Sequence, residues 1–214
     1  PNHPQIASAL NNLGNIYGAR GDNRKAAEFY RRVLTIREST LGAEHPQTAA
    51  ALNNLANVTY DTAAAERLHL RALAIREKTL GAEHQDVAQT LYNLGKIFAA
   101  AGDYSKAENY TRRSLIVFEK ALGADHQFVS YSLNLLAAIY KFKGDYSGAE
   151  TLFLRTAALK EKVSPLHPEL GGTLTNLATV YVLKGDIEKA IAAQTRANEI
   201  LEYNALLNLR IGSE

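Results

Sequence analysis

No cysteine occurs in the 214 residues, which excludes disulfide bonds and zinc sites built from thiolates. The sequence also lacks any apolar run near the ~20 residues that a membrane-spanning helix needs, and it has no signal-type start. Its formal net charge of +2 is too small to indicate a nucleic-acid-binding surface. Methionine is missing even from the first position, so we take the chain to be a fragment of a longer protein. The remaining composition, 46% hydrophobic and 21% charged, is ordinary for a soluble protein, and we expect the protein to be cytoplasmic.

Histidine marks an internal repeat. Five of the six histidines stand in short, similar segments such as LGAEHPQ at Leu41–Gln47 and LGADHQF at Leu122–Phe128. These five lie 42, 39, 42 and 41 residues apart, at His3, His45, His84, His126 and His167. The sequence therefore predicts five repeats within residues 1–201, namely 3–44, 45–83, 84–125, 126–166 and 167–201, and a helical extension over 202–214.

Each repeat has the pattern of two amphipathic helices joined by a tight turn. The first helix of the first repeat has an apolar face made of Ile6, Leu10, Leu13, Gly14 and Tyr17. A second apolar face follows, made of Ala26, Phe29, Tyr30, Val33, Leu34 and Ile36. Four repeats have Gly-Asp between the two stretches, where glycine ends one helix and aspartate caps the next, at Gly21, Gly102, Gly144 and Gly185. Strand signals are absent. Because such helix pairs cannot bury their apolar faces alone, the sequence predicts an all-α solenoid of about five stacked repeats.

Several of these motifs resemble the tetratricopeptide repeat. They are Leu10-Asn-Asn-Leu-Gly, the Gly-Asp turn, and Lys25-Ala-Ala-Glu-Phe-Tyr-Arg-Arg-Val-Leu. The long repeat with LGAEHP between units is similar to the kinesin-light-chain type, and the resemblance covers about residues 1–201. It implies a right-handed α-solenoid whose concave groove is lined by the first helix of each repeat. Members of the family mostly bind peptides or protein partners and lack catalysis, so we expect a protein that is not an enzyme.

The repeated histidine has two interpretations. A ladder of metal ligands would need neighbouring histidines to share an ion. Helix layers are roughly 8–10 Å apart, whereas a metal binds nitrogen at about 2.0–2.1 Å. The alternative is a helix start, since Pro4, Pro46 and Pro168 follow histidine at a position where the missing N–H has no cost. We therefore interpret the histidine as a helix-start signal, and we predict no metal and no other cofactor.

The face of the first helices opposite the core is rich in asparagine and is the candidate peptide-binding surface. Its residues are Asn11, Asn12, Asn15, Asn53, Asn54, Asn57, Gln89, Tyr92, Asn93, Lys96, Tyr131, Asn134, Lys141 and Asn176. Asparagine is a weak helix former, roughly 0.5–0.7 kcal/mol worse than alanine, so a compensating interaction is expected. Either the amides bond neighbouring helices across the stack, or they present donors and acceptors to an extended peptide. The family resemblance favours the second account.

The groove becomes more apolar towards the C-terminal half, where Leu135, Phe142 and Val182 face it. A suitable ligand would therefore combine a polar stretch with an apolar anchor. A carboxylate clamp, which some members of the family use, would need basic residues where Asn11, Gln89 and Asn93 stand. We therefore reject binding of chaperone tails.

Charged residues recur on the second helices. The glutamates Glu38, Glu77, Glu119 and Glu161 are expected to be solvated or paired with the neighbouring cations Arg37, Arg76 and Lys120. The arginines fall on the convex, solvated face: Arg31, Arg32, Arg71, Arg112 and Arg113. Because the groove itself is not basic, we predict no nucleic-acid binding. The lack of a long apolar run leads us to predict no membrane contact.

The predicted function is a protein-interaction scaffold that binds a peptide or partner segment in the concave groove. An alternative comes from the tail NEILEYNALLNLRIGSE, which resembles the linker between such repeats and CHAT-type, caspase-like protease domains in bacterial proteins. In that case the chain is a regulatory arm of a larger protein; a plain capping helix is the competing interpretation. Homo-oligomerisation through the convex or terminal faces is a third hypothesis.

Two local irregularities lead to structural predictions. The stretch NVTYDTAAAERL of the second repeat is three residues short where Gly-Asp should stand. Either an unusual link joins the two helices or the chain is interrupted, and we predict a break between Thr62 and Ala63. In the tail, apolar residues occupy more than one helix face, namely Leu206, Leu207, Leu209 and Ile211. We therefore predict that part of residues 203–214 is exposed in a monomer.

Overall fold

The computed structural model describes residues 4–211, and the side chains of residues 5–207. His3, with which the first predicted repeat begins, lies outside this range. Within it the chain forms ten α-helices and no strand, which confirms the predicted all-α class. The helices are α1 (Pro4–Ala19), α2 (Asn23–Leu41), α3 (Pro46–Asn57), α4 (Thr62–Leu80), α5 (Gln85–Ala100), α6 (Tyr104–Leu122), α7 (Gln127–Lys143), α8 (Tyr146–Val163), α9 (Pro168–Lys184) and α10 (Ile187–Ile211).

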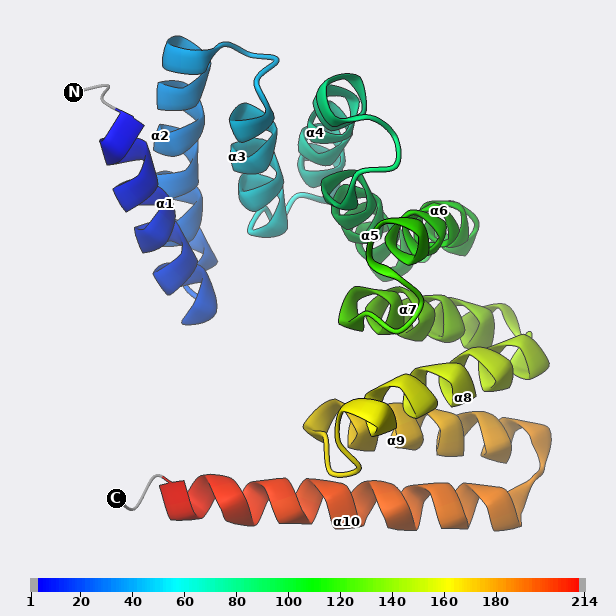
Figure 1. The fold of residues 1–214 in the computed structure, drawn as a ribbon. Helices are drawn as coiled ribbons and strands as arrows, with labels where there is room; N and C mark the ends of the chain where they lie inside the picture. Colours follow the sequence, from blue (N-terminus) through cyan, green and yellow to red (C-terminus); the bar gives the residue numbers. More distant parts are fainter. Residues whose placement is uncertain (1–3, 212–214) are drawn as a thin grey trace. The chain divides into compact units, whose positions relative to one another are not determined.

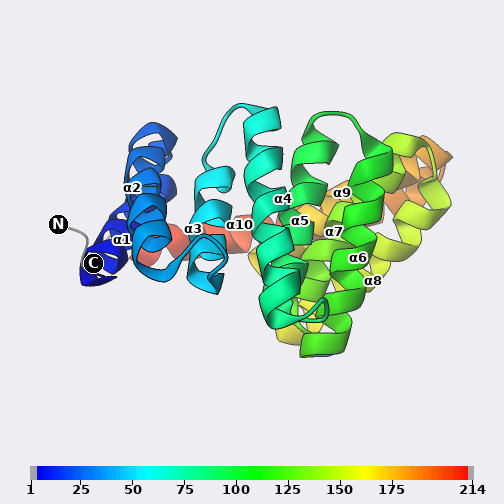
Figure 2. The same cartoon turned by 90° about the horizontal axis from the view of Figure 1, so that it is seen from above.

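The helices pack as consecutive hairpins within two compact units. Unit 1, Pro1–Ala121, holds the hairpins α1–α2, α3–α4 and α5–α6, and unit 2, Leu122–Glu214, holds α7–α8 and α9–α10 (Figure 1). In unit 1 each hairpin packs against the next along the chain, so the hairpins follow one another in a row (Figure 2). Each unit is therefore a stretch of α-solenoid. No helix in the described part of the chain combines the length and apolar character of a membrane span.

The predicted helix faces form the core within each unit. Leu52, Leu91 and Leu133, which occupy one position of the repeat, are fully buried. Gly95 of α5 lies close against the second helix of its hairpin. A Cβ on Gly95 would collide with the hydroxyl of Thr111, which donates a hydrogen bond to a backbone carbonyl at 2.7 Å. Glycine therefore lets α5 and α6 approach closely.

The first hairpin departs from the predicted core pattern. Ile6 and Leu13 are 38% and 40% exposed, although their counterparts Val87 and Leu94 are completely buried. In the next repeat the residue equivalent to Leu13 is Leu55, which packs against α2 of the preceding hairpin. Within the described residues no helix precedes α1, so its outer flank stays open. Burial at these positions depends on a neighbour rather than on the helix's own pattern.

The repeated histidines cap the first helices, which confirms their interpretation as helix-start signals. In each case the ring Nδ1 accepts a hydrogen bond from the backbone N–H two residues further along. The pairs are His45 with Gln47 at 3.2 Å, His84 with Asp86 at 3.1 Å, His126 with Phe128 at 3.2 Å and His167 with Glu169 at 3.2 Å. Each cap satisfies a donor that the helix leaves unpaired, which is worth about 1 kcal/mol.

The predicted chain break in the second repeat is wrong. Helix α4 begins at Thr62 and continues through Ala63 without interruption. The carboxylate of Asp61 caps this helix by accepting hydrogen bonds from the N–H groups of Ala63 and Ala64 at 2.9 and 3.1 Å. The missing residues are taken up by α3, which has 12 residues where α5 has 16. The structure therefore shows the alternative, an unusual link between α3 and α4. This link keeps the aspartate that caps α4 but lacks the glycine of the Gly-Asp turn.

The C-terminal extension continues the last helix. Helix α10 has 25 residues and runs past the predicted repeat end at Leu201. Tyr203, Leu206 and Leu207 are exposed, which confirms the expected incomplete burial for these residues. Asn204 attaches the first turn of the extension to the loop between α8 and α9, because its side chain donates a hydrogen bond to the Leu166 carbonyl at 2.8 Å. The side chains of Leu209 and Ile211 lie outside the described residues.

Candidate functional site

The first helices of neighbouring hairpins lie side by side and are joined by side-chain amides. In unit 1, Asn54 on α3 donates to the Oδ1 of Asn11 on α1 at 3.0 Å. One repeat later, Asn93 on α5 donates to the Oδ1 of Asn53 on α3 at 3.1 Å. Asn53 and Asn93 are buried. For these four residues the hydrogen bonds support the structural account, in which amides hold the stack together.

A buried histidine lies beneath this amide chain and was not singled out from the sequence. His69 on α4 has no solvent exposure, and its Nδ1 is 3.1 Å from the Oδ1 of Asn53. Because an amide oxygen can only accept, Nδ1 carries a proton and donates it to Asn53. Burial, together with the smaller effect of the positive charges on Arg76 and Lys96, lowers the pKa of His69 from 6.5 to about 4. The available signal was that His69 is the one histidine outside the capping position.

Buried cations connect each second helix to the start of the next first helix. Arg76 donates to the carbonyl of Asp86 at 2.8 Å and to the Thr90 hydroxyl at 2.7 Å. Lys160 makes the equivalent bonds in unit 2, to the Glu169 carbonyl and the Thr173 hydroxyl. Burial lowers the pKa of both cations. These contacts correct the expectation that Arg76 pairs with the adjacent Glu77.

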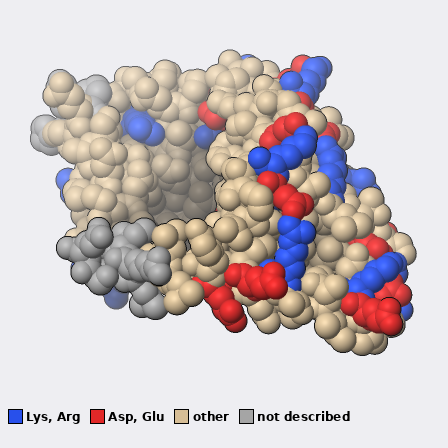
Figure 3. Space-filling model, turned by 60° about the horizontal axis from the view of Figure 1, so that its bottom comes forward, with Lys and Arg blue, Asp and Glu red and all other residues tan. Residues whose placement is uncertain are grey.

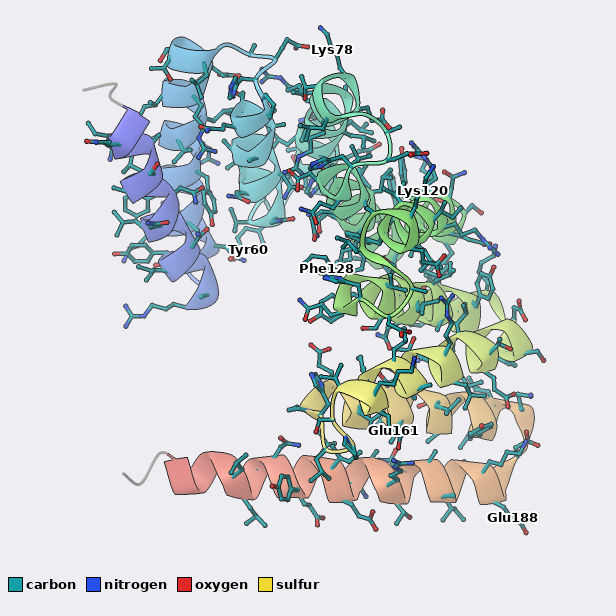
Figure 4. All side chains as sticks on the ribbon, in the orientation of Figure 1. Tyr60, Lys78, Lys120, Phe128, Glu161 and Glu188 are labelled. Atoms are coloured by element: carbon teal, nitrogen blue, oxygen red, sulfur yellow. The ribbon has the colours of Figure 1, made fainter. Side chains whose placement is uncertain are left out.

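The glutamates of the second helices pair with arginines of the next second helix instead. The ion pairs are Glu38 with Arg71 at 2.7 Å, Glu77 with Arg113 at 2.8 Å, and Glu161 with Arg196. We call this series the ladder. A parallel series joins the acid of each LGAEH-type segment to a lysine near the end of the next second helix. The pairs are Glu44 with Lys78, Glu83 with Lys120, and Asp125 with Lys162. Lys78, Lys120 and Glu161 mark these rows in Figure 4.

The second-helix face is therefore charge-compensated. On the face shown in Figure 3, basic and acidic side chains lie next to one another and form no large patch of one sign. Where the ladder runs, such a surface offers little to a charged ligand, because the paired charges compensate each other. The expected solvent-facing position of the arginines is confirmed for Arg71 and Arg113, which remain partly exposed in their ion pairs.

The first-helix face of unit 1 has a recess. It is lined by Ala56, Asn57, Thr59, Asn93, Lys96, Ile97 and Ala100. The recess lies where α3 ends a turn early, so the short second repeat opens space beside α5. Lys96 and Asn57 are exposed there. The Lys96 ammonium lies 5.9 Å from the centre of the Tyr92 ring, and no carboxylate among the described residues pairs with it. This recess brings Asn57, Asn93 and Lys96 of the predicted site together, and Tyr92 lies next to Lys96.

The other predicted site residues have mixed roles. Asn12 is exposed, whereas Asn15 accepts a hydrogen bond from the Tyr30 hydroxyl at 2.8 Å. Gln89 is half-buried and donates to Asn93 at 3.2 Å. In unit 2, the Tyr131 hydroxyl donates to Glu169 at 3.3 Å and Lys141 donates to Asn176 at 3.5 Å. The Oδ1 of Asn134 is buried and has no hydrogen-bond partner in the described part of the chain.

Unit 2 has an apolar recess between α9 and α10. It is lined by Ala178, Thr179, Val182, Ile187, Ala190, Ile191 and Gln194. Val182 of α9 and Ile187 and Ile191 of α10 are exposed there. Over residues 4–211, no three His, Asp or Glu side chains converge in a way that could hold a metal ion.

Comparison with known families identifies the repeat. A family model described as the tetratricopeptide repeat matches residues 5–64, 61–120 and 131–202, which together make up most of the chain. A comparison with curated proteins finds no match.

Solved structures with the same fold include two related to kinesin light chains. BtubC (BKLC) from P. vanneervenii is 27% identical, with a TM-score of 0.81 over 95% of this chain and 82% of that chain. A putative kinesin light chain from Podosopora anserina with nearly identical TPR-like repeats is 25% identical, with a TM-score of 0.78 over 94% of this chain and 98% of that chain. The predicted likeness to the kinesin-light-chain type is thus confirmed.

A more distant structure was determined with a bound factor. The Rap protein in complex with Competence and Sporulation Factor is 18% identical, with a TM-score of 0.75 over 94% of this chain and 56% of that chain. At this identity the likeness shows the shared fold alone.

Proposed function

The chain belongs to the tetratricopeptide repeat family, and on that premise we propose that it is a non-enzymatic scaffold that binds an extended segment of a partner protein on its first-helix face. The fold is one that serves as a protein–protein interaction scaffold. The charges of the two faces support the choice of surface. Along the ladder the second-helix face has ion pairs between its own charges, and the first-helix face has an unpaired cation beside a recess.

The recess at Lys96 is the observation that carries this proposal. The exposed ammonium provides three hydrogen-bond donors, and Asn57 provides both donors and an acceptor. An extended peptide that places an acidic side chain or its carbonyl groups at this recess would satisfy both residues. The Tyr92 ring beneath the ammonium offers an apolar surface for the neighbouring residue of the peptide. We therefore assign ligand contact to Asn12, Asn57, Tyr92 and Lys96.

The amides used within the stack have a supporting role in this proposal. Asn53 and Asn93 are buried with His69, so they position the first helices rather than contact the ligand. The same holds for Asn11 and Asn54, whose side chains bond each other. The apolar anchor of the ligand would bind to the exposed side chains of unit 2. The Rap protein, which shares the fold, binds a factor named in its structure, and this is consistent with a partner segment as the ligand here.

Replacing Lys96 with alanine is expected to weaken peptide binding about tenfold, because a charge-assisted hydrogen bond is lost from an exposed recess. The ligand is found by selecting random peptides on the immobilised 214-residue chain and synthesising the enriched ones. Their affinities for the wild type and for Lys96→Ala are then measured by calorimetry. Selected peptides should be rich in Asp or Glu.

The matched control is Lys78→Ala, which removes an exposed lysine from the second-helix face. Its affinity for the same peptides should equal that of the wild type. Equal affinities of Lys96→Ala and the wild type, or a loss confined to Lys78→Ala, would show that the first-helix face of unit 1 is not the binding surface.

The regulatory-arm function is a second candidate, and the exposed extension of α10 favours it. Tyr203, Leu206 and Leu207 present apolar surface that a following domain would cover. We expect fast amide exchange over 203–211 in the dilute 214-residue chain, and slower exchange in a protein that continues beyond Glu214. Uniformly slow exchange in the dilute chain would mean that the extension only closes its own stack, which contradicts this candidate.

A further inference from the structure

A second recess of unit 1 lies beside the short link between α3 and α4, which Tyr60 marks in Figure 4. It has a volume of about 350 Å³ and borders α2, whereas the recess at Lys96 borders α5. Thr59 of the link lines both recesses, so the early end of α3 opens space on two sides. The lining residues of the second recess are Arg31, Leu55, Thr59, Ala64, Arg67, Leu68 and Arg71.

Three arginines surround this recess, and two of them are unpaired. Arg31 of α2 and Arg67 of α4 are exposed and have no ion-pair partner in the described part of the chain. Arg71 shares its charge with Glu38 of the ladder at 2.7 Å. No Asp or Glu among the described residues lines the recess itself. The three arginines and the one paired glutamate therefore leave a net charge of +2 at this place.

This combination of arginines is not part of the repeat. Arg71 belongs to the ladder and recurs, whereas the charges of Arg31 and Arg67 are absent from the equivalent positions of the other junctions within a unit. Those positions, with the ladder arginine last, hold Leu70, Asn109 and Arg113 in unit 1, and Leu154, Ala192 and Arg196 in unit 2. The two additional arginines thus accompany the shortened second repeat, and the stacking of second helices elsewhere does without them.

The isolated charge fits one doubly charged group better than a polyanion. Nucleic acids and anionic membranes are bound by basic residues spread over a surface, and the basic residues next to this recess are compensated by Glu38 and Glu44. A phosphate monoester carries about −1.5 to −2 charges at neutral pH and has three acceptor oxygens. The planar guanidinium of arginine can donate two parallel hydrogen bonds to such a group.

We propose that this recess binds a phosphorylated side chain of a partner protein. The guanidinium groups of Arg31 and Arg67 bind the phosphate from α2 and α4, and Arg71 adds a third positive charge. Leu55 and Leu68 contact the hydrocarbon part of the same side chain. The volume lies near the lower end of the roughly 300–1,000 Å³ of ligand sites, and exposed arginines leave it open, which suits one group carried by a larger partner. The site is separate from the proposed peptide-binding surface at Lys96.

Inorganic phosphate at neutral pH is the first probe. In a chain with ¹⁵N-labelled arginine side chains, the Nε–H signals of Arg31 and Arg67 should shift and saturate. Arg31→Gln and Arg67→Gln should each weaken phosphate binding about tenfold, because each removes a charged pair of donors. Glu38→Gln frees Arg71 from its ion pair and should strengthen binding about threefold. Arg32→Gln, an exposed neighbour that does not line the recess, is the matched control and should have no effect.

The second probe is a pool of random peptides with one fixed phosphoserine, compared with the same pool containing serine. The immobilised bait is the Lys96→Ala chain, so that peptides binding through Lys96 are not selected. Only the phosphorylated pool should be captured. Adding Arg67→Gln to the bait should weaken the binding of individual captured peptides about tenfold. A failure of the peptide-binding proposal at Lys96 therefore leaves this test unchanged.

Three results would overturn the proposal. The first is that captured phosphopeptides bind equally well with and without Arg67→Gln. The second is that they bind no more tightly than inorganic phosphate, because the partner would then add nothing. The third is that anionic vesicles or RNA bind through Arg67 while phosphopeptides do not, which would assign the recess to another class of ligand.

Discussion

Lowering the pH from 7 to 4 is expected to remove about 3 kcal/mol of stability through His69 alone. The folded protein holds the pKa of His69 at about 4, because the ring is buried and because Arg76 and Lys96 are positively charged. The unfolded chain binds a proton near pH 6.5. Between these values the unfolded chain is protonated and the folded chain is not, so acid favours unfolding. The contribution is complete above pH 6.5 and is lost as the pH falls towards 4.

Urea unfolding at pH 7, 5.5 and 4 measures this effect in the wild type and in His69→Gln. Glutamine can still donate to Asn53 but does not take up a proton, so the variant should lose about 3 kcal/mol less over this range. The ring resonances of His69 give a direct check by NMR, and Lys96→Ala should raise the pKa of His69. A titration midpoint near 6.5 in the folded protein would contradict the buried, neutral state.

Replacing Phe153 with alanine is expected to destabilise the protein by about 3–5 kcal/mol. The Phe153 ring has no solvent exposure and belongs to the core cluster that joins α7, α8, α9 and α10. Its removal leaves a cavity between helices that are fixed by many other contacts, so the site cannot fully collapse. Denaturant unfolding followed by circular dichroism measures the change.

The neighbouring Leu154 provides the matched control, because it is exposed on the same helix. Leu154→Ala should change stability by less than about 0.5 kcal/mol, as is usual at the surface. Phe153→Leu should lie between the two, because much of the ring volume is kept. A similar loss in both alanine variants would mean that burial at Phe153 does not set the stability of this unit.

Local features were predictable from the sequence because their partners are close along the chain. The cap formed by His84 is an example, since Nδ1 bonds an N–H only two residues further on. Helix periodicity and the Gly-Asp turns are local in the same way, and they were sufficient for the hairpins and the all-α class. The sequence also showed that the second repeat is three residues short, but it did not show that α3 would be the shorter helix. Whether a deficit breaks a chain or shortens a helix depends on the helix that must pack there.

The sequence predicted which helix face carries the candidate site, but not which residues of that face are free to contact a ligand. The repeat pattern placed Lys96 and Asn57 on the first-helix face together with Asn53 and Asn93, without separating them. The structure separates them because Asn53 and Asn93 meet each other across two helices, whereas Lys96 lies beside the space left by the short α3. Two residues with the same helical phase can thus differ in role when their neighbouring helices differ.

The sequence by itself determined the repeat period, the helix pairs, their caps and the family, because all of these depend on residues within a few turns of one another. The tertiary structure decided which distant residues pair. Glu38 binds Arg71 of the next hairpin, while Arg37 beside it reaches the carbonyl of Gln47. It also decided that Ile6 stays exposed although it follows the core pattern. The physical reason is that pairing and burial require a second surface at the right distance, and helix stacking alone sets that distance.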